Sequence, residues 1–400
     1  NPKMSDLNQE LKGLLPYAAK RQKEYILKYM ELGNQRAVAK HFGVNSRTVE
    51  RALEGLRKRA AKSGWAPRND MTRHAAPGFK ISGQWTKVKV KEDGSEQVYK
   101  KSIYQTRDAE QFDEMLQAVV ESWCEEARGL VEPVAPPEAS LDDLMTVYPM
   151  GDPHFGMYAW AAEVGDNFDL DIAERDLCAA VDHLVSQSPA SKRGVLINLG
   201  DFFHTDNMRG ETSISGHALD TDGRLQKMID VGVRALRRCI HRMLEKHEVV
   251  EIINAPGNHD NVLALALNVM FRNIYENEPR VTVHDAPTMR HYIEHGRVLL
   301  GVVHGHQTKD SALPGIMATE KPEEWGRTRH RYFFRGHHHH DDKQEYNGCT
   351  VEQFRTLAAG DAYAVGSGYL SGRDMKALVM HKAFGEVARF TCGIDLLRAA

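Results

Sequence analysis

Side chains that bind metal ions or transfer protons recur at five places in this sequence, each directly after an apolar or aromatic run. The apolar run 249–254 leads into Gly257-Asn258-His259-Asp260, and the other four places are at Asp152 and His154, at Asp201, at His304, and at His337 to His340. Asparagine offers a neutral carbonyl oxygen to a cation, and histidine offers a ring that titrates near neutral pH. Because the carboxyl ends of strands in an open sheet meet at one edge, this spacing predicts that the five groups converge on one crevice.

The elements that must position these groups alternate between strands and helices. The predicted strands are 147–150, 195–199, 249–254, 281–284, 298–303 and 331–334. Amphipathic patterns predict helices at about 170–187 and 220–246, whereas few helices are expected after them. We therefore expect an α/β fold with layered sheets and a β-rich second half.

The first 66 residues form a basic segment, with 14 lysines and arginines against 6 acidic residues. Helical periodicity predicts helices at 21–32 and 35–42, and a third helix that is capped by Ser46 and runs to about residue 62. The turn at Gly43, with small and apolar residues spaced around it, resembles a helix-turn-helix. The third helix would then enter the major groove of DNA. The residues expected to contact DNA are Arg36, Lys40, Arg47, Thr48 and Arg51. An ordinary three-helix bundle with a solvated basic face is the alternative.

The middle of the chain contains three weaker patterns. Alternating residues on either side of Asp93-Gly94 predict a β-hairpin. Residues 108–131 have the periodicity of an amphipathic helix, which is expected to pack against a domain or to form a homo-oligomer with a second protomer. Residues 131–138 contain three prolines and are expected to form a stiff linker.

Four hundred residues exceed one ordinary domain. Three parts are expected: a helix-turn-helix domain at 1–66, the hairpin, amphipathic helix and linker at 67–140, and the domain with the five polar groups at 141–400. No apolar run approaches the roughly 18 residues that span a membrane, and residues 1–20 contain no apolar signal segment. A cytoplasmic protein without a membrane partner is therefore expected. The five cysteines are odd in number and form no Cys-x-x-Cys pair, so reduced thiols are expected.

Taken in order, the five polar groups resemble the five motifs of the calcineurin-like metallophosphoesterases. The matching stretches are Gly151-Asp152-Pro153-His154, Gly200-Asp201-Phe202-Phe203-His204, Gly257-Asn258-His259-Asp260, Val303-His304-Gly305-His306 and Gly336-His337-His338-His339. The resemblance covers about residues 145–395. It implies a layered β-sandwich flanked by helices and a site for two divalent metal ions. Mn²⁺ is the expected ion, with Zn²⁺, Fe²⁺ or Mg²⁺ as alternatives.

The resemblance also implies which residues hold the metals. One ion would be bound by Asp152, His154 and His339, the other by Asn258, His304 and His337, and Asp201 would bridge both. In the fourth motif His306 is the alternative ligand, although His304 lies nearer the end of its predicted strand. In the run of four histidines the motif spacing selects His337 and His339, and a shifted register is the alternative.

The catalytic roles come from the same resemblance. A hydroxide between the two metals would be the nucleophile. His259 would stabilise the phosphate or protonate the leaving oxygen, and Asp260 would orient the His259 ring.

Two further features indicate the substrate. His204 in Gly-Asp-Phe-Phe-His, together with residues 348–352 after the fifth motif, resembles the SbcD-type nuclease branch of the family. The alternative for His204 is a supporting contact to a metal ligand. A basic helix-turn-helix tethered to a phosphoesterase would raise the local concentration of DNA, so a metal-dependent DNA nuclease of phage or mobile-element origin is expected. The alternatives are a phosphatase or cyclic-nucleotide phosphodiesterase whose N-terminal helices mediate assembly, and a DNA-binding regulator with an inactive phosphoesterase domain.

Overall fold

The structure is a computed structural model that describes residues 4–67, 79–90, 96–107, 125, 128–207, 210–212, 218–368 and 370–399. The chain divides into two compact units, Asn1–Glu121 and Ser122–Ala400. The expected turn at Asp93-Gly94 and most of the expected helix 108–131 lie outside the described residues.

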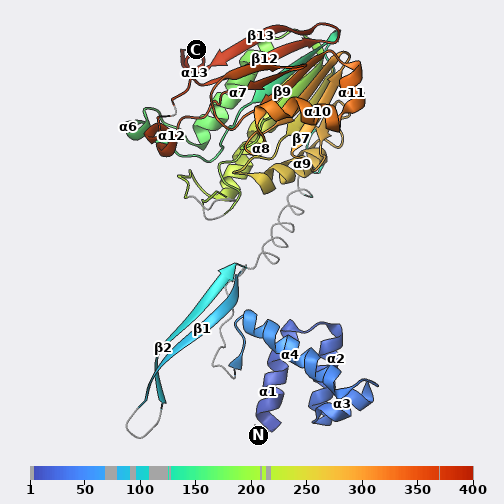
Figure 1. Ribbon diagram of the computed structural model, residues 1–400, viewed down its shortest axis with the longest axis vertical. Coiled ribbons are helices and arrows are strands. Elements are labelled where there is room, and N and C mark those ends of the chain that lie inside the picture. The colour runs from blue at the N-terminus through green and yellow to red at the C-terminus, as the bar shows by residue number, and fades with distance from the viewer. Residues whose placement is uncertain are drawn as a thin grey trace. The chain divides into compact units, whose positions relative to one another are not determined.

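The first unit begins with helices that share one small core (Figure 1). They are α1 (Met4–Leu14), the 3-10 helix η1 (Leu15–Tyr17), α2 (Lys20–Leu32), α3 (Gln35–His41) and α4 (Ser46–Lys62). Leu11, Ile26, Val38 and Leu56 are fully buried between them. Because the α3–α4 connection turns sharply, Gly43 has φ of 63° in the left-handed region that glycine adopts without strain.

The N-terminal cap of α4 differs from the prediction by one residue. The Asn45 side chain, and not Ser46, accepts a hydrogen bond, from the Arg47 amide at 2.9 Å. Asparagine is among the preferred N-cap residues because its short side-chain oxygen reaches the free amides of the first turn.

Two long strands follow the helices in the first unit. Strand β1 (Phe79–Val90) pairs antiparallel with β2 (Glu96–Arg107), and the pair forms a sheet of its own. The register contains irregularities between Ile81 and Gly83 and between Lys87 and Val88.

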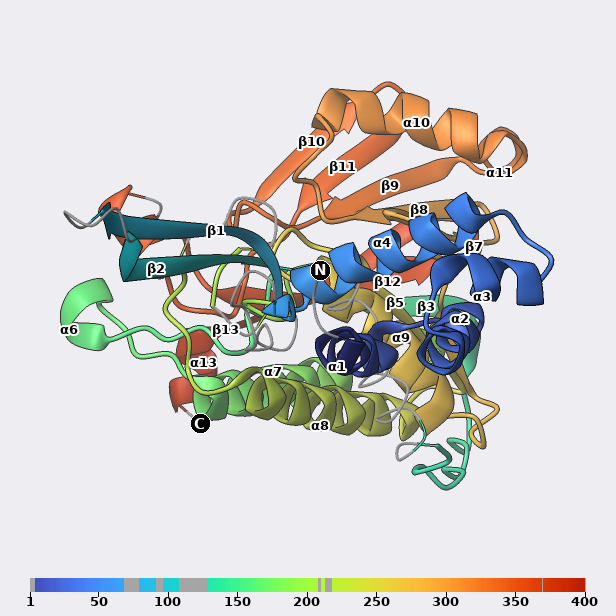
Figure 2. The ribbon, with the colours of Figure 1, turned by 90° about the horizontal axis from the view of Figure 1, so that it is seen from below.

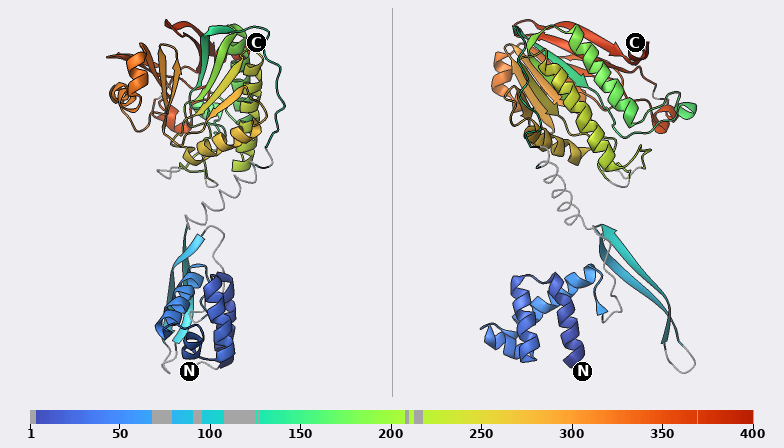
Figure 3. Two further views of the ribbon diagram at one scale, coloured as in Figure 1. Left: turned by 90° about the vertical axis from the view of Figure 1, so that its right-hand side faces the viewer. Right: turned by 180° about the vertical axis from the view of Figure 1, so that it is seen from behind.

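The second unit contains two sheets. The six-stranded sheet has the order β13-β12-β3-β4-β5-β6, and the five-stranded sheet has the order β10-β11-β9-β8-β7. Their strands are β3 (Leu141–Met150), β4 (Ser191–Asn198), β5 (Val249–Asn254), β6 (Val281–His284), β7 (Arg290–His295), β8 (Val298–Val303), β9 (His330–Arg335), β10 (Asp342–Tyr346), β11 (Cys349–Gln353), β12 (Asp374–His381) and β13 (Gly385–Gly393). The left view of Figure 3 shows the two sheets as separate layers.

The main core lies between these sheets. Val147, Val195 and Ile253 of the first sheet pack with Leu300 and Phe334 of the second, and all five are buried. Removing this apolar surface from water is the main stabilising contribution to such a sandwich. The expectation of a layered α/β fold is met in this unit.

Helices cover the outer faces of the sandwich. Helices α7 (Leu170–Gln187) and α8 (Leu225–Leu244) lie side by side, and α9 (Asn261–Ile274) packs on β5 and β6 (Figure 2). Helix α10 (Leu313–Glu320) covers the five-stranded sheet, where Leu313 and Met317 contact Phe333. The remaining short helices are α6 (Ala161–Val164), η3 (Asp310–Ala312), α11 (Pro322–Arg327), α12 (Ala362–Gly366) and α13 (Ile394–Ala399).

The proline-containing segment 131–138, which was expected to be a stiff linker, belongs to the second unit and is hydrogen-bonded to other parts of it. The Val134 amide donates to Glu278 Oε2 at 2.6 Å, and Arg280 Nη1 donates to the Val134 carbonyl oxygen at 2.8 Å. Just before it, the Gly129 amide donates to the Asn273 carbonyl oxygen at 3.0 Å. Backbone groups of this segment thus have partners on the second unit, which a free linker would leave to water.

In the part of the chain that the structure describes, no helix combines the length and apolar character needed to cross a membrane. The four cysteines described there, Cys178, Cys239, Cys349 and Cys392, are buried and free.

Candidate metal centre

Five loops meet at one edge of the sandwich, and each follows a strand. Strands β3, β4 and β5 are mutually parallel, as are β8 and β9, so their carboxyl ends point the same way within each sheet. The His304 ring contacts the loop after β4, since its Nδ1 donates to the Leu199 carbonyl oxygen at 2.8 Å. The His337 amide contacts the loop after β3 by donating to Asp152 Oδ2 at 2.9 Å. These contacts bring the ends of both sheets to a common site.

The backbone of these loops is strained. Among the described residues, five that are not glycine have positive φ, and all five belong to the expected metal ligands: Asp152 (44°), His154 (48°), Asp201 (51°), His337 (78°) and His339 (59°). A residue with a Cβ rarely adopts this left-handed conformation, because it costs roughly 1–2 kcal/mol. Strain of this kind persists where function requires a particular side-chain direction.

Asp152, His154 and His339 form the first cluster. Their donor atoms lie within 4.8 Å of one another. The Nε2 atoms of His154 and His339 are 3.2 Å apart, and His339 Nε2 lies 3.5 Å from Asp152 Oδ1. Two imidazole nitrogens and a buried carboxylate oxygen thus face a common point.

Asp201, His304 and His337 form the second cluster, again with donor atoms within 4.8 Å. His304 Nε2 lies 3.1 Å from Asp201 Oδ2 and 3.0 Å from Asn258 Oδ1, so Asn258 faces the same point. Asp201 is also joined to the loop after β5, because its Oδ1 accepts the His259 amide at 2.8 Å.

The buried carboxylates of this site attract positive charge. Asp152 and Asp201 are almost completely buried. Burial opposes ionisation of Asp201, but His304, His259 and His154 around it hold its pKa well below the usual value. Burial likewise opposes protonation of His304, but Asp201 and Asp152 outweigh this effect and raise the pKa of His304 to about 9. Buried carboxylates that draw positive charge so strongly are typical of ligands for a metal ion.

The ring orientation of His304 also fits metal binding. Because Nδ1 donates to the Leu199 carbonyl oxygen, Nε2 is the nitrogen that faces Asp201 and Asn258. A ligating histidine in most metal sites uses its second nitrogen in this way. Two motif glycines allow the close approach of the loops, since a Cβ on Gly257 would overlap the Asp201 carboxylate and one on Gly336 would overlap that of Asp152.

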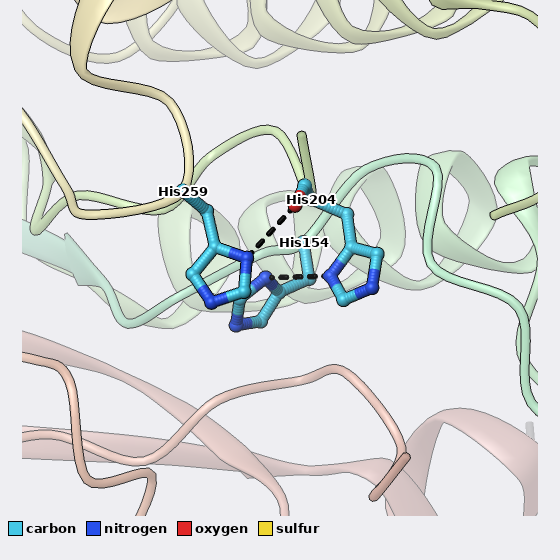
Figure 4. A group of neighbouring side chains, drawn as sticks. All are labelled: His154, His204 and His259. Atoms are coloured by element: carbon cyan, nitrogen blue, oxygen red, sulfur yellow. Dashed lines mark hydrogen bonds between the residues drawn. The ribbon is translucent and has the colours of Figure 1, made fainter. Parts of the chain in front are cut away.

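His259 and His204 lie beside the first cluster (Figure 4). The His259 ring is half-buried, and its Nδ1 donates to the His204 carbonyl oxygen at 2.8 Å, which fixes the orientation of the ring. His204 is buried, and its Nδ1 lies 3.2 Å from Nδ1 of His154. His204 is therefore placed to support the ring of His154, and burial lowers the pKa of His204 to about 3.

The structure does not support the expected role of Asp260 in orienting the His259 ring. Asp260 is fully buried, and its two oxygens accept the Phe203 amide at 3.1 Å and the Gly257 amide at 3.2 Å. Through these two hydrogen bonds, Asp260 connects the loop after β4 to the loop after β5. The His204 carbonyl orients the His259 ring instead, and no side-chain pattern in the sequence could have indicated a backbone group.

The neighbouring histidines lie outside the two clusters. The His306 ring centroid is 5.2 Å from that of His304, but His306 donates no atom to either three-residue cluster. In the run of four histidines, His337 and His339 face the clusters, whereas His338 and His340 are exposed.

Thr356 and Arg335 are supporting residues that the sequence patterns did not identify. The Thr356 hydroxyl donates to the Asp152 carbonyl oxygen at 2.7 Å. Arg335 is buried and pairs with Asp310, which connects the start of the fifth motif to the chain after the fourth.

The expected DNA-contact residues lie in the first unit, on α3 and α4. Arg36, Lys40, Arg47, Thr48 and Arg51 are all exposed. Farther along α4, Arg57 pairs with Glu10 at 2.8 Å and Lys58 with Glu54 at 3.5 Å. Within the described residues Arg47 and Arg51 have no such acidic partner, so their charges face solvent.

No known family profile matches the chain, and no curated protein matches its sequence. Similar solved structures include Vps29 from Entamoeba histolytica complexed with Zn²⁺, which is 12% identical over 62% of this chain and 99% of that chain, with a TM-score of 0.28. Another is a conserved uncharacterised protein, a predicted phosphoesterase, from Streptococcus pneumoniae, which is 10% identical over 62% of this chain and 98% of that chain, with a TM-score of 0.27. Similarities this distant do not carry a functional argument.

Proposed function

We propose that this chain is a calcineurin-like metallophosphoesterase that hydrolyses phosphodiester bonds of DNA with two divalent metal ions. The single observation that carries the proposal is the left-handed backbone at Asp152, His154, Asp201, His337 and His339. Five strained residues that are all motif residues, and that point their side chains into two adjacent clusters, match a two-metal centre.

The residues divide naturally between two ions. Asp152, His154 and His339 would hold one, and Asn258, His304 and His337 the other, with Asp201 between them. All seven expected ligands are present, which favours an active centre over an inactive scaffold. Oxygen and imidazole donors of this kind suit Mn²⁺, and also Zn²⁺ or Fe²⁺. Bound metal ions would neutralise phosphate charge and activate a water molecule.

His259 is the proton donor in this proposal. Its Nδ1 is engaged with the His204 carbonyl, so a proton on Nε2 is the one available to a leaving alkoxide. His204 holds the His154 ring from the side opposite His339, which fixes the direction of a ligand nitrogen. The position of His204 is compatible with the SbcD-type nuclease branch that the second motif resembles.

The N-terminal helices supply the argument for DNA. A short helix, a turn at Gly43 and a longer helix that exposes Arg47, Thr48 and Arg51 agree with a helix-turn-helix. Tethering such a module to a phosphoesterase raises the effective concentration of its polymeric substrate. A DNA substrate is therefore favoured over a small phosphoester.

The test is cleavage of labelled DNA by the full chain in the presence of Mn²⁺, with linear and circular substrates, each single- and double-stranded. The four consecutive histidines, His337 to His340, provide both test variants and control variants. His337→Gln and His339→Gln should abolish cleavage and lower metal content, whereas His338→Gln and His340→Gln should leave both within about twofold. Cleavage that survives His337→Gln and His339→Gln would overturn the assignment of the site. Metal-dependent hydrolysis of bis(p-nitrophenyl) phosphate without any cleavage of DNA would favour the phosphatase or cyclic-nucleotide phosphodiesterase alternative.

A further inference from the structure

The hairpin of the first unit exposes large apolar side chains. Tyr104 is 58% exposed, Trp85 47% and Ile103 38%, and β1 and β2 form a sheet of two strands within the described residues. A two-stranded sheet is only marginally stable in water, so exposed aromatic rings on it bring no compensating burial. Exposed apolar groups that are not explained by packing commonly mark an interaction site.

The strand register places the two aromatic rings on one face. Gly83 is opposite Tyr104, and Trp85 is two residues beyond Gly83 in a stretch without irregularities. Residues that face each other across an antiparallel pair share a face, as do residues two apart along a strand. Trp85 and Tyr104 therefore project from the same side. Ile103, which is opposite Gln84, projects from the other side.

The hairpin is also strongly basic. Its two strands contain Lys80, Lys87, Lys89, Lys100, Lys101 and Arg107, but only one acidic residue, Glu96, which gives a net charge of +5 over 24 residues. Such a charge attracts a polyanion and disfavours an apolar or basic protein partner. Aromatic rings among positive charges are the combination that binds unpaired nucleic acid, because bases stack on the rings and phosphates pair with the lysines.

We propose that the Trp85–Tyr104 face of the hairpin binds an unpaired DNA strand by base stacking. Duplex DNA does not fit this face, since its bases are already stacked and their flat surfaces are covered. The inference rests on the proposed DNA-cleaving function and defines its substrate more closely. Within the first unit, α4 would bind duplex and the hairpin an adjoining single strand, so the preferred substrate is DNA with a junction between the two.

The experiment measures binding of fluorescein-labelled dT20 and of a 20-base-pair duplex to the full chain by fluorescence anisotropy, without added divalent metal so that cleavage is suppressed. Loss of one stacking ring should weaken single-strand binding roughly 5- to 150-fold. The double variant Trp85→Ala/Tyr104→Ala should therefore lose at least tenfold for dT20 and change less than twofold for the duplex. Ile103→Ala, on the opposite face of the same sheet, is the matched control and should bind both as wild type does.

Trp85→Phe/Tyr104→Phe keeps two stacking rings and should retain dT20 affinity within about threefold, which separates loss of stacking from loss of folding. Crosslinking of 5-iodouracil-substituted single strands to the wild-type chain should also map to Trp85 or Tyr104. Unchanged dT20 binding in the alanine double variant, or crosslinks elsewhere only, would overturn the inference while leaving the proposed nuclease intact. A wild-type chain that binds neither DNA would instead refute the DNA part of the proposed function, and hydrolysis of the small diester would still report on the metal centre.

Discussion

His259 provides the sharpest test of the proposed chemistry, because its ring lies outside the two clusters that would hold the metals. The backbone amide of His259, and not its ring, contacts the Asp201 carboxylate, at 2.8 Å. The Nδ1 atom of the ring donates a hydrogen bond to the His204 carbonyl oxygen at 2.8 Å. His259→Ala should therefore keep its metal ions and bind substrate normally, but lose the proton on Nε2.

The expected loss in rate follows from that single proton. General acid catalysis increases the rate of the chemical step roughly 10²- to 10⁴-fold. This factor corresponds to about 3–5 kcal/mol of transition-state stabilisation. His259→Asn is the matched variant. Its side-chain amide can replace the Nδ1 donor to the His204 carbonyl but has no counterpart of Nε2. If Nε2 is the acid, His259→Asn should be as slow as His259→Ala, even though the loop contact is restored.

The assay compares two leaving groups in single-turnover experiments, with metal content measured on the same samples. A nitrophenolate leaves as a stable anion and needs little protonation, so both variants should be far less impaired on bis(p-nitrophenyl) phosphate than on DNA. Equal defects on both substrates with metal retained would refute the acid role and favour electrostatic stabilisation of the phosphate. Loss of metal in His259→Ala would show that the ring is itself a ligand.

Replacing Asp201 by Asn should remove more metal than Asp152→Asn does, because in the proposed site Asp201 serves both ions and Asp152 only one. Two ions retained after dialysis, measured by elemental analysis of Asp201→Asn, would contradict this. Changing Arg47 and Arg51 together to Ala should weaken DNA binding and reduce the slope of log K against log salt by about 2, since each phosphate contact contributes about 0.9; an unchanged slope would identify α4 as a packing helix. Burial lowers the pKa of His247 to about 4, so the ring is neutral in the folded chain near neutral pH. The unfolded chain binds a proton on this ring below the ordinary pKa of 6.5, whereas the folded chain does not. The free energy of unfolding is therefore unaffected above pH 6.5 and decreases as pH falls toward 4. Between pH 7 and 5, wild type should therefore lose about 2 kcal/mol more unfolding free energy than His247→Gln in urea titrations, and parallel losses would show that His247 titrates normally.

The convergence of the candidate ligand residues could be predicted because residue type and strand ends are local information. Each follows a short apolar run, so residue type and the end of a strand together indicate a site at a sheet edge. Strands β4, β5 and β8 were predicted to within four residues for the same reason. Strands β7, β10, β11, β12 and β13 were not predicted. In β7 (Arg290–His295), for example, polar residues surround the two apolar side chains Tyr292 and Ile293, so no apolar run marks the strand.

What the sequence could not provide was the tertiary environment of each side chain. Asp260 follows His259 directly, and adjacency predicted a contact with its ring. The fold instead directs the carboxylate to the amides of Phe203 and Gly257. Segment 131–138 has the composition of a linker, yet its partners Glu278 and Arg280 are distant in sequence. Contacts of that kind depend on which surfaces meet, and composition does not encode them.

If the centre binds metal as proposed, its left-handed residues would connect metal supply to the amount of folded protein in a cell. At about 1 kcal/mol each, five such residues cost about 5 kcal/mol, a large part of the 5–15 kcal/mol by which a typical domain is stable. Metal binding to the native chain would offset this cost by mass action. During metal starvation more of the chain would unfold and be degraded by proteases. Its abundance would then fall together with its activity, and no separate regulator would be needed.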